Sequence, residues 1–102
     1  MEFNIRHQGD ETVIALAGRL GFSEAEELVP AIEQIIDRRH NRLVFDLSKL
    51  SMVTSDGLAS LLHLRYLARK TGGHLRVCNP LPLVREVFET TQLSKLFQLA
   101  EK

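Results

Sequence analysis

Two hydroxyls, a carboxylate and a glycine stand together at Thr54-Ser55-Asp56-Gly57, where the hydrophobic pattern of the chain changes. The apolar run before them, residues 43–45, is typical of a buried strand, and the apolar residues after them recur at helical spacing. In an α/β sheet, the functional crevice lies at the carboxyl ends of parallel strands. A hydroxyl at that place, beside the free backbone N–H groups of a helix start, is the main candidate for function.

By residue type alone, Ser55 is expected to be the N-cap of the following helix, a role worth about 1 kcal/mol. Asp46 is expected to end its strand near the same loop and to hold loop backbone N–H groups. A phosphoacceptor role for Asp46 of the response-regulator type is disfavoured, because the chain lacks the acidic pair that would hold Mg²⁺. Asp56 and Gly57 are candidate contact residues, since glycine allows close approach and a carboxylate can meet a partner cation.

Other catalytic and metal-binding patterns are missing from the sequence. The four histidines are scattered without metal-ligand spacing, so no metal site and no cofactor is expected. The chain has no G-x-S-x-G elbow, P-loop or G-x-G-x-x-G motif. Ser55 also has no evident His and Asp partners that would make it a nucleophile. We therefore expect that the protein is not an enzyme.

The elements that position this turn follow from periodicity. Strands are expected at about residues 3–6, 12–17, 42–47 and 74–78, and helices at about 23–37, 55–70 and 83–90. Ser23 and Glu26 form a predicted capping box, Pro30 predicts a kink or restart, and Gly72-Gly73 predicts the end of the second helix. Leu93, Leu96, Phe97 and Leu99 predict one more short strand or turn. The order β-β-α-β-α-β-α predicts an α/β fold with a mixed, mostly parallel sheet.

The second helix has an expected core stripe at Leu58, Leu61, Leu64 and Ala68, and it also carries apolar residues outside that stripe. Leu62 and Tyr66 lie one turn apart, so they are candidates for the apolar part of a docking face. Arg65 and Arg69 are also one turn apart, and they predict either a solvated face or a contact with an acidic partner.

Length and composition limit the functional classes. The 102 residues predict a single domain, and the 13 acidic and 13 basic residues give zero net charge. No global field therefore favours nucleic acid or an anionic membrane as a partner. No apolar run approaches the roughly 20 residues of a membrane span, and the N-terminus does not resemble a signal peptide. With the lone Cys78, these features predict a cytoplasmic protein.

Several motifs together resemble the STAS domain, in its bacterial anti-sigma factor antagonist branch. They are Asp46-Leu-Ser, Leu50-Ser51, Thr54-Ser-Asp-Gly-Leu58, the Cys78-Asn79-Pro80 region, and Thr91-Gln92-Leu93 with Leu96-Phe97. The resemblance covers nearly the whole chain and implies one STAS domain over residues 1–102. It also implies a small mixed sheet with helices mostly on one side.

The resemblance implies a phosphorylation-switched function. The phosphoacceptor of the family falls on Ser55, with Thr54 as a second candidate, and Asp46, Thr54, Ser55, Asp56, Gly57, Leu62 and Tyr66 become the expected partner-binding residues. The implied partner is an anti-sigma factor that is also a serine kinase of the histidine-kinase-like ATPase fold. Unphosphorylated antagonist binds it and frees the sigma factor, and a metal-dependent serine phosphatase resets the phosphorylated form. The free protein is expected to be a monomer.

This sequence departs from the family pattern on both sides of Ser55. Thr54 stands where the family usually has an aspartate, and Asp56 stands where it often has a hydroxyl or an alanine. These differences leave an alternative open, namely a STAS adaptor that binds an ABC-transporter ATPase or a signalling scaffold without phosphorylation.

Overall fold

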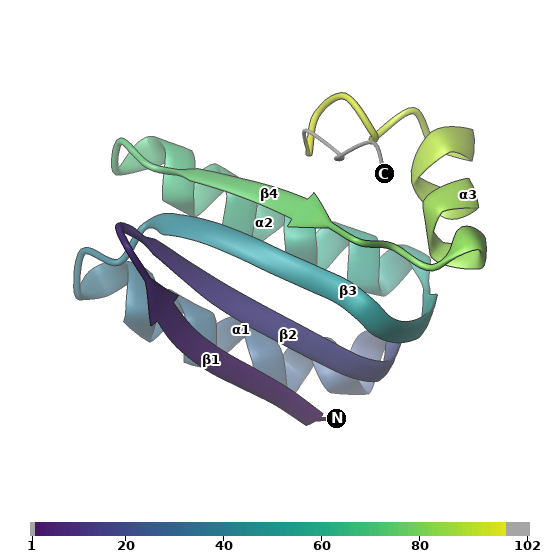
Figure 1. Ribbon diagram of the computed structural model, residues 1–102, viewed down its shortest axis with the longest axis horizontal. Coiled ribbons are helices and arrows are strands. Elements are labelled where there is room, and N and C mark those ends of the chain that lie inside the picture. The colour runs from purple at the N-terminus through teal and green to yellow at the C-terminus, as the bar shows by residue number, and fades with distance from the viewer. Residues whose placement is uncertain (1, 98–102) are drawn as a thin grey trace.

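The computed structural model describes residues 2–97, which form four strands and three helices (Figure 1). In chain order the elements are β1 (Glu2–Gln8), β2 (Glu11–Leu20), α1 (Phe22–Asp37), β3 (Arg42–Val53), α2 (Ser55–Lys70), β4 (His74–Cys78) and α3 (Pro82–Thr90). The predicted α/β class and element order are confirmed. Of the short strand or turn expected near residues 93–97, the structure has turns, and Leu99 lies outside the described residues.

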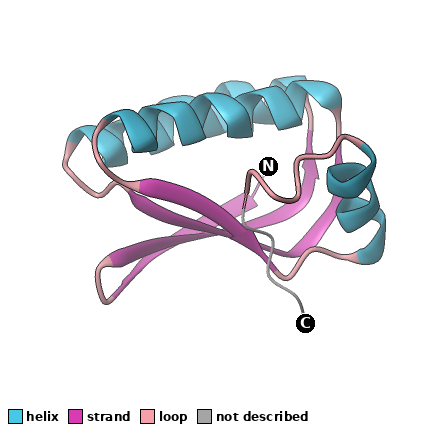
Figure 2. Cartoon of the chain, turned by 90° about the horizontal axis from the view of Figure 1, so that it is seen from above, coloured by secondary structure: helices cyan, strands magenta, loops and turns pink. Residues whose placement is uncertain are grey.

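The strands form one sheet in the order β1-β2-β3-β4. β1 is antiparallel to β2, whereas the β2–β3 and β3–β4 pairs are parallel. Helices α1 and α2 lie side by side on one face of the sheet, and α3 lies beyond its end (Figure 2). The carboxyl ends of β2 and β3 therefore meet the starts of α1 and α2 at one edge.

Strand β3 is six residues longer than the sequence predicted. The register against β2 shifts twice, between Ala15 and Ala17 and between Gly18 and Arg19, and each shift places one extra residue in β3. After these shifts the core-facing residues of β3 are three apart, at Leu47, Leu50 and Val53. Residues 48–53 do not match a strand pattern in the sequence, because the two bulges hide the alternation that identifies a strand.

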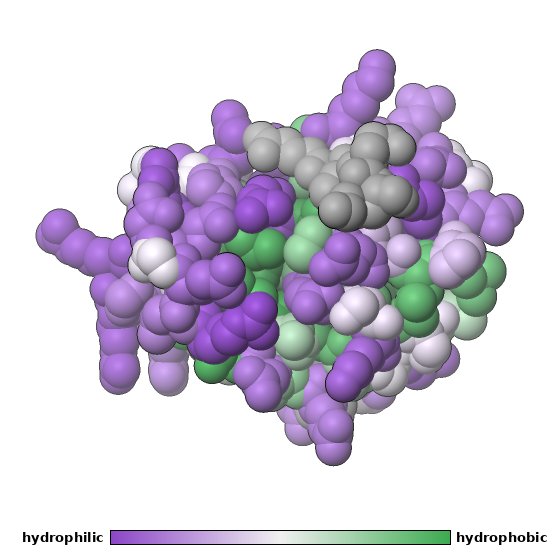
Figure 3. Space-filling view, in the orientation of Figure 1, coloured by the Kyte–Doolittle hydropathy of each residue, from purple (hydrophilic) through white to green (hydrophobic). Residues whose placement is uncertain are grey.

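The core lies between the sheet and the two long helices. Leu28, Ile32 and Ile36 face it from α1. The predicted stripe of α2 is confirmed, because Leu58, Leu61, Leu64 and Ala68 are all buried. The opposite sheet face is open, and Figure 3 shows apolar side chains at its centre framed by hydrophilic ones.

The start of α1 differs from the prediction. Gly21, not Ser23, is the N-cap, and the Gly21 N–H donates to Glu24 Oε1 at 3.0 Å. Gly21 and Glu24 have the same spacing as Ser23 and Glu26, so spacing alone could not choose between the two pairs. The helix then runs through exposed Pro30 without a restart, although Pro30 has no N–H to donate to the preceding turn.

The end of α2 follows the prediction. Gly72 has φ of 90°, the left-handed conformation that glycine provides after a helix. Gly73 packs so closely that an added Cβ would lie 2.0 Å from the Asn41 carbonyl oxygen. Within residues 2–97, no helix is long and apolar enough to cross a membrane.

Candidate functional site

The candidate site is the turn from β3 into α2, which rests against the connection from β2 to α1. The Thr54 N–H donates to the Leu20 carbonyl oxygen at 3.0 Å. This bond joins the ends of two neighbouring parallel strands and fixes where the next helix begins. The first turn of α2 is thus positioned by tertiary contact as well as by its own sequence.

The N-cap of α2 is Thr54, which corrects the expectation that Ser55 has this role. Thr54 is extended, with φ of −97° and ψ of 175°, and its Oγ1 accepts from the Gly57 N–H at 3.3 Å. Ser55 is the first helical residue, and its side chain is exposed. Because Thr54 caps the helix, the hydroxyl of Ser55 is available to a partner or an enzyme.

Gly57 allows a close approach, but the atoms that approach it belong to the same chain and not to a partner. It is buried, and a Cβ at this position would lie 2.2 Å from the Leu20 carbonyl oxygen and 2.9 Å from Val53 Cγ2. Any side chain here would push α2 away from the end of β2. Gly57 therefore lets α2 pack against the end of β2, and it is not part of the exposed surface of the site.

The start of α2 keeps two backbone donors available. The Thr54 N–H bonds to Leu20, the Gly57 N–H bonds to Thr54, and the Leu58 N–H closes the first helical bond to the Thr54 carbonyl at 2.9 Å. Within residues 2–97, the N–H groups of Ser55 and Asp56 have no such acceptor. A helix start with free N–H groups binds anions, phosphate included.

The outer face of α2 brings Ser55, Leu62 and Tyr66 into line. Leu62 and Tyr66 follow Ser55 by about two and three helical turns, so the three residues share one side. Leu62 is half-buried and Tyr66 is 59% exposed, with Lys70 Nζ 5.8 Å from the Tyr66 ring centre.

Arg65 and Arg69, which were expected at a solvated face or at a contact with an acidic partner, have different surroundings. Arg69 is exposed, whereas the side chain of Arg65 contacts the segment after α3. Arg65 Nε donates to the Leu96 carbonyl oxygen at 3.1 Å. Burial, with a smaller contribution from Arg69, lowers the pKa of the Arg65 guanidinium. Arg65 therefore has a structural contact in place of the solvated position expected for it.

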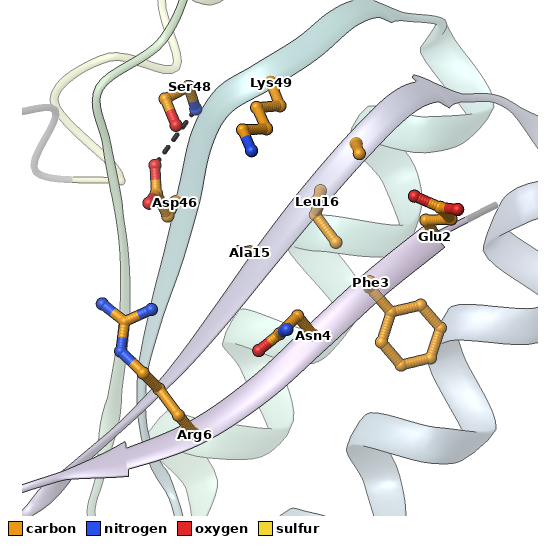
Figure 4. A pocket seen from close by; sticks show the side chains of 10 residues that line it. Glu2, Phe3, Asn4, Arg6, Ala15, Leu16, Asp46, Ser48 and Lys49 are labelled. Atoms are coloured by element: carbon orange, nitrogen blue, oxygen red, sulfur yellow. Dashed lines mark hydrogen bonds between the residues drawn. The ribbon is translucent and has the colours of Figure 1, made fainter.

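Asp46 is separated from the rest of the predicted site. It lies within β3, paired with Ala15 and Cys78, and not at the strand end as the sequence suggested. It belongs to the open face of the sheet, where Figure 4 shows it beside a shallow groove of about 640 Å³ with Arg6, Asn4 and Lys49. Asp46 Oδ1 accepts the Ser48 N–H at 3.1 Å, so the expected backbone capping occurs at the first bulge of β3.

Two exposed apolar residues flank the turn and were not predicted from the sequence. Phe22, the first residue of α1, is 62% exposed, and Met52, paired with Arg19 near the end of β3, is 40% exposed. Large apolar side chains at both sides of a polar turn are typical of a protein interface. Their pattern in the sequence is indistinguishable from that of core residues, so only the fold identifies them.

Across the part of the chain that the structure describes, no group of three or more His, Cys, Asp or Glu side chains is placed to hold a metal ion.

Comparison with known proteins agrees with this architecture. Residues 3–99 match the family model described as "Mlab, STAS domain". The chain belongs to the STAS domain family. A relative named as an anti-sigma factor antagonist, BtrV of Bordetella bronchiseptica, is 32% identical over 86% of this chain and 76% of its own length.

Two solved structures of SpoIIAA show the same fold. Unphosphorylated SpoIIAA, an anti-sigma factor antagonist, is 24% identical with a TM-score of 0.84, and the match covers 99% of this chain and 90% of that one. The phosphorylated form of SpoIIAA is 22% identical with a TM-score of 0.76, over 99% and 93% of the two chains. This STAS domain is therefore of the anti-sigma factor antagonist type.

Proposed function

We propose that this STAS protein is a phosphorylation-switched binding module. In its unphosphorylated form it binds an anti-sigma factor that is a serine kinase of the histidine-kinase-like ATPase fold, and so releases a sigma factor. Phosphorylation of Ser55 breaks the complex, and a metal-dependent serine phosphatase restores the binding form. The protein itself acts in the cytoplasm by binding, without catalysing a reaction.

The observation that carries the proposal is the exposure of Ser55 at the start of α2, with the cap supplied by Thr54. A kinase can reach a hydroxyl that holds no capping bond. Thr54 is a poorer acceptor, because it is half-buried and its Oγ1 binds the Gly57 N–H. The free N–H groups of Ser55 and Asp56 would accommodate the phosphate without unfolding the helix.

The switch acts by repulsion at the interface. A phosphate adds about two negative charges where a partner must pack between Met52, Phe22 and the outer face of α2. Asp56, exposed in the first turn, already contributes one negative charge beside it. The added charge disfavours a partner surface that accepts the neutral serine, while the fold of the antagonist stays the same.

The first test is intact mass spectrometry of the protein from its native cells, with fragmentation across residues 46–62. A phosphate on Ser55 is expected under at least one growth condition. A phosphate on Thr54 would move the acceptor by one residue. Unmodified protein under every condition would contradict the switch and favour the adaptor that binds an ABC-transporter ATPase or a scaffold.

The second test uses calorimetric titration with the candidate kinase to compare two substitutions that each add one negative charge. Ser55→Asp is expected to lower the affinity at least about tenfold, since an unpaired charge in an interface costs about 2 kcal/mol or more. Gln34→Glu, exposed near the C-terminal end of α1 and three helical turns from Phe22, is the control and is expected to change the affinity much less. Full affinity of Ser55→Asp would refute repulsion as the mechanism.

A further inference from the structure

The two edges of the sheet are not equally protected. On the outer side of β4, the Val77 N–H donates to the Phe97 carbonyl oxygen at 3.2 Å, so the C-terminal turns cover part of that edge. β1 is the opposite edge, bonded to β2 alone in the described sheet, and Figure 1 shows it as the outermost strand. All of its side chains except Phe3 are exposed, including that of Ile5. Such an edge is a template for another strand.

The hairpin determines which backbone groups of β1 point outward. Gln8 and Glu11 close a two-residue turn, and Gly9 at its first position has φ of 64°, as a type II′ turn requires. The closing pair of such a turn is hydrogen-bonded, and bonded pairs then alternate along the strands. Glu2, Asn4, Arg6 and Gln8 therefore bond to β2. The N–H and C=O groups of Phe3, Ile5 and His7 face the free edge.

We propose that β1 pairs antiparallel with β1 of a second copy, about a twofold axis at Asn4. This register places Glu2 opposite Arg6 of the partner subunit, and Arg6 opposite Glu2 of the partner subunit. On the helix side of the sheet it places Phe3 opposite Ile5 of the partner subunit. The outward groups of Phe3 and Ile5 then bond across the interface, and two four-stranded sheets become one of eight strands.

The side chains favour this register over its neighbour. A twofold axis at Ile5 also satisfies the backbone, but it places Glu2 opposite Gln8 and Asn4 opposite Arg6 of the partner subunit, with no opposite charges. Directly opposed ion pairs and apolar pairs stabilise antiparallel strands, so the Asn4 axis is preferred. A slip of one residue between the strands places outward groups against groups already bonded to β2, which excludes it.

The cost of forming the contact in the free chain is low. Arg6 lies across the open face of the sheet (Figure 4), where its Nε donates to Gln8 Oε1 at a long 3.4 Å. Among residues 2–97, turning this exposed side chain to the edge gives up only that hydrogen bond. Because the strand is short and its ion pairs are exposed, the dimer is weak and sensitive to salt.

The dimer would present two docking faces for the proposed partner, but its formation does not depend on the proposed function. α2 packs over β3 and β4, away from β1, so Ser55 stays exposed in each copy. Two identical docking faces in one particle increase the effective affinity for a partner that is itself dimeric. In this proposal the protein is a weak dimer, whereas the sequence predicted a monomer.

Sedimentation velocity from micromolar to millimolar concentration, in low and high salt, tests the proposal. The wild type is expected to change from the mass of one chain to that of two, more readily in low salt. Arg6→Glu and Glu2→Arg are each expected to remain monomeric, because like charges then face each other. The double variant Glu2→Arg/Arg6→Glu is expected to dimerise again, and Glu26→Arg, on exposed α1 surface, is the control that still dimerises.

A wild type that stays monomeric at every concentration would overturn the proposal. So would a double variant that stays monomeric while the wild type dimerises, because the register would then be wrong. Far-ultraviolet circular dichroism and thermal unfolding establish that each variant is folded. None of these outcomes depends on phosphorylation of Ser55, so the dimer and the switch fail independently.

A disulfide test reports the twofold axis directly. In a Cys78→Ser background, Asn4→Cys is expected to form a disulfide with its counterpart. The two Cα atoms of a directly opposed, non-bonded pair lie about 4.5 Å apart, within the range for a disulfide. Gln8→Cys is far from its own counterpart in this register and is expected to remain reduced. Equal cross-linking of both variants would contradict the Asn4 axis.

Discussion

The starts of α1 and α2 are two versions of the same structural device. Each follows a parallel strand, each has an exposed serine in its first turn, and each has an acidic residue there. At α1 the cap is completed by a carboxylate, since Glu24 Oε1 accepts the Gly21 N–H. At α2 the cap is a neutral hydroxyl, since Thr54 Oγ1 accepts the Gly57 N–H.

Because of this difference, a phosphate is more favourable on Ser55 than on Ser23. The positive end of α1 already holds the charge of Glu24, which also lies 3.9 Å from Arg19 Nε. The positive end of α2 is capped without charge, so an anion on Ser55 meets helix donors that no capping carboxylate occupies. The negative charge of Asp56 makes the start of α2 less favourable for an anion on Ser55. It does not block the site, because the Asp56 carboxylate makes no described hydrogen bond to the N–H groups of the helix start.

The largest predicted effect comes from the glycines of the two starts. Gly57→Ala is expected to lower the free energy of unfolding by about 3 kcal/mol, because its Cβ would meet the Leu20 carbonyl oxygen at 2.2 Å. Gly21→Ala is the matched control and is expected to cost less than about 1 kcal/mol, since its Cβ would meet only the movable side chains of Arg19 and Glu24. Urea unfolding measures both, and equal losses would refute the close packing of Gly57.

A second prediction concerns partner binding by the outer face of α2. Tyr66→Ala is expected to lower the affinity for the kinase about tenfold, since exposed aromatic side chains dominate protein interfaces. Glu26→Ala, on the exposed face of α1, is expected to have little effect. Calorimetric titration distinguishes the two, and unchanged affinity of Tyr66→Ala would move the docking face away from this part of α2.

The third prediction compares the stability lost when the capping hydroxyl is removed with that lost when a neighbouring serine hydroxyl is removed. Thr54→Ala is expected to cost about 1 kcal/mol of stability, and Thr54→Ser much less, because serine keeps the accepting oxygen. Ser55→Ala and Ser23→Ala are each expected to stay within about 0.5 kcal/mol of the wild type. If Ser55→Ala were as costly as Thr54→Ala, the cap would have to be assigned to Ser55 after all.

The smallest effect is the pH dependence that Glu24 gives to the start of α1. The N–H groups of Glu24 itself and of Gly21 hold the pKa of the Glu24 carboxyl below its ordinary value of 4.5. A lowered pKa in the folded state gives stability that is present above pH 4.5 and is lost as the pH falls through the lowered value. The stability advantage of the wild type over Glu24→Gln is therefore expected to shrink on acidification.

Urea unfolding of the wild type and Glu24→Gln at several pH values from neutral to acidic measures this difference, with Glu26→Gln as the control. An advantage that does not change with pH would show that the charge of Glu24 is irrelevant to the cap.

Much of the fold could be read from the sequence, because its signals are local. The apolar stripe of α2, the glycines after it and the residues of β4 were all placed correctly. The second half of β3 was missed because two bulges replace the strand period of two with a spacing of three. Since bulges arise from pairing with β2, no pattern within β3 could reveal them.

The sequence by itself determined the element order and the turn that carries Ser55, because hydrophobic periodicity and helix-start residues act over a few neighbours. Only the tertiary structure decided which residue caps each helix, since the bond from Thr54 to Leu20 and the contact of Gly57 with the same carbonyl fix the start of α2. It also decided that Asp46 lies apart from Ser55 and that β1 has a free edge. These properties depend on how distant segments pair, and local patterns carry no record of that pairing.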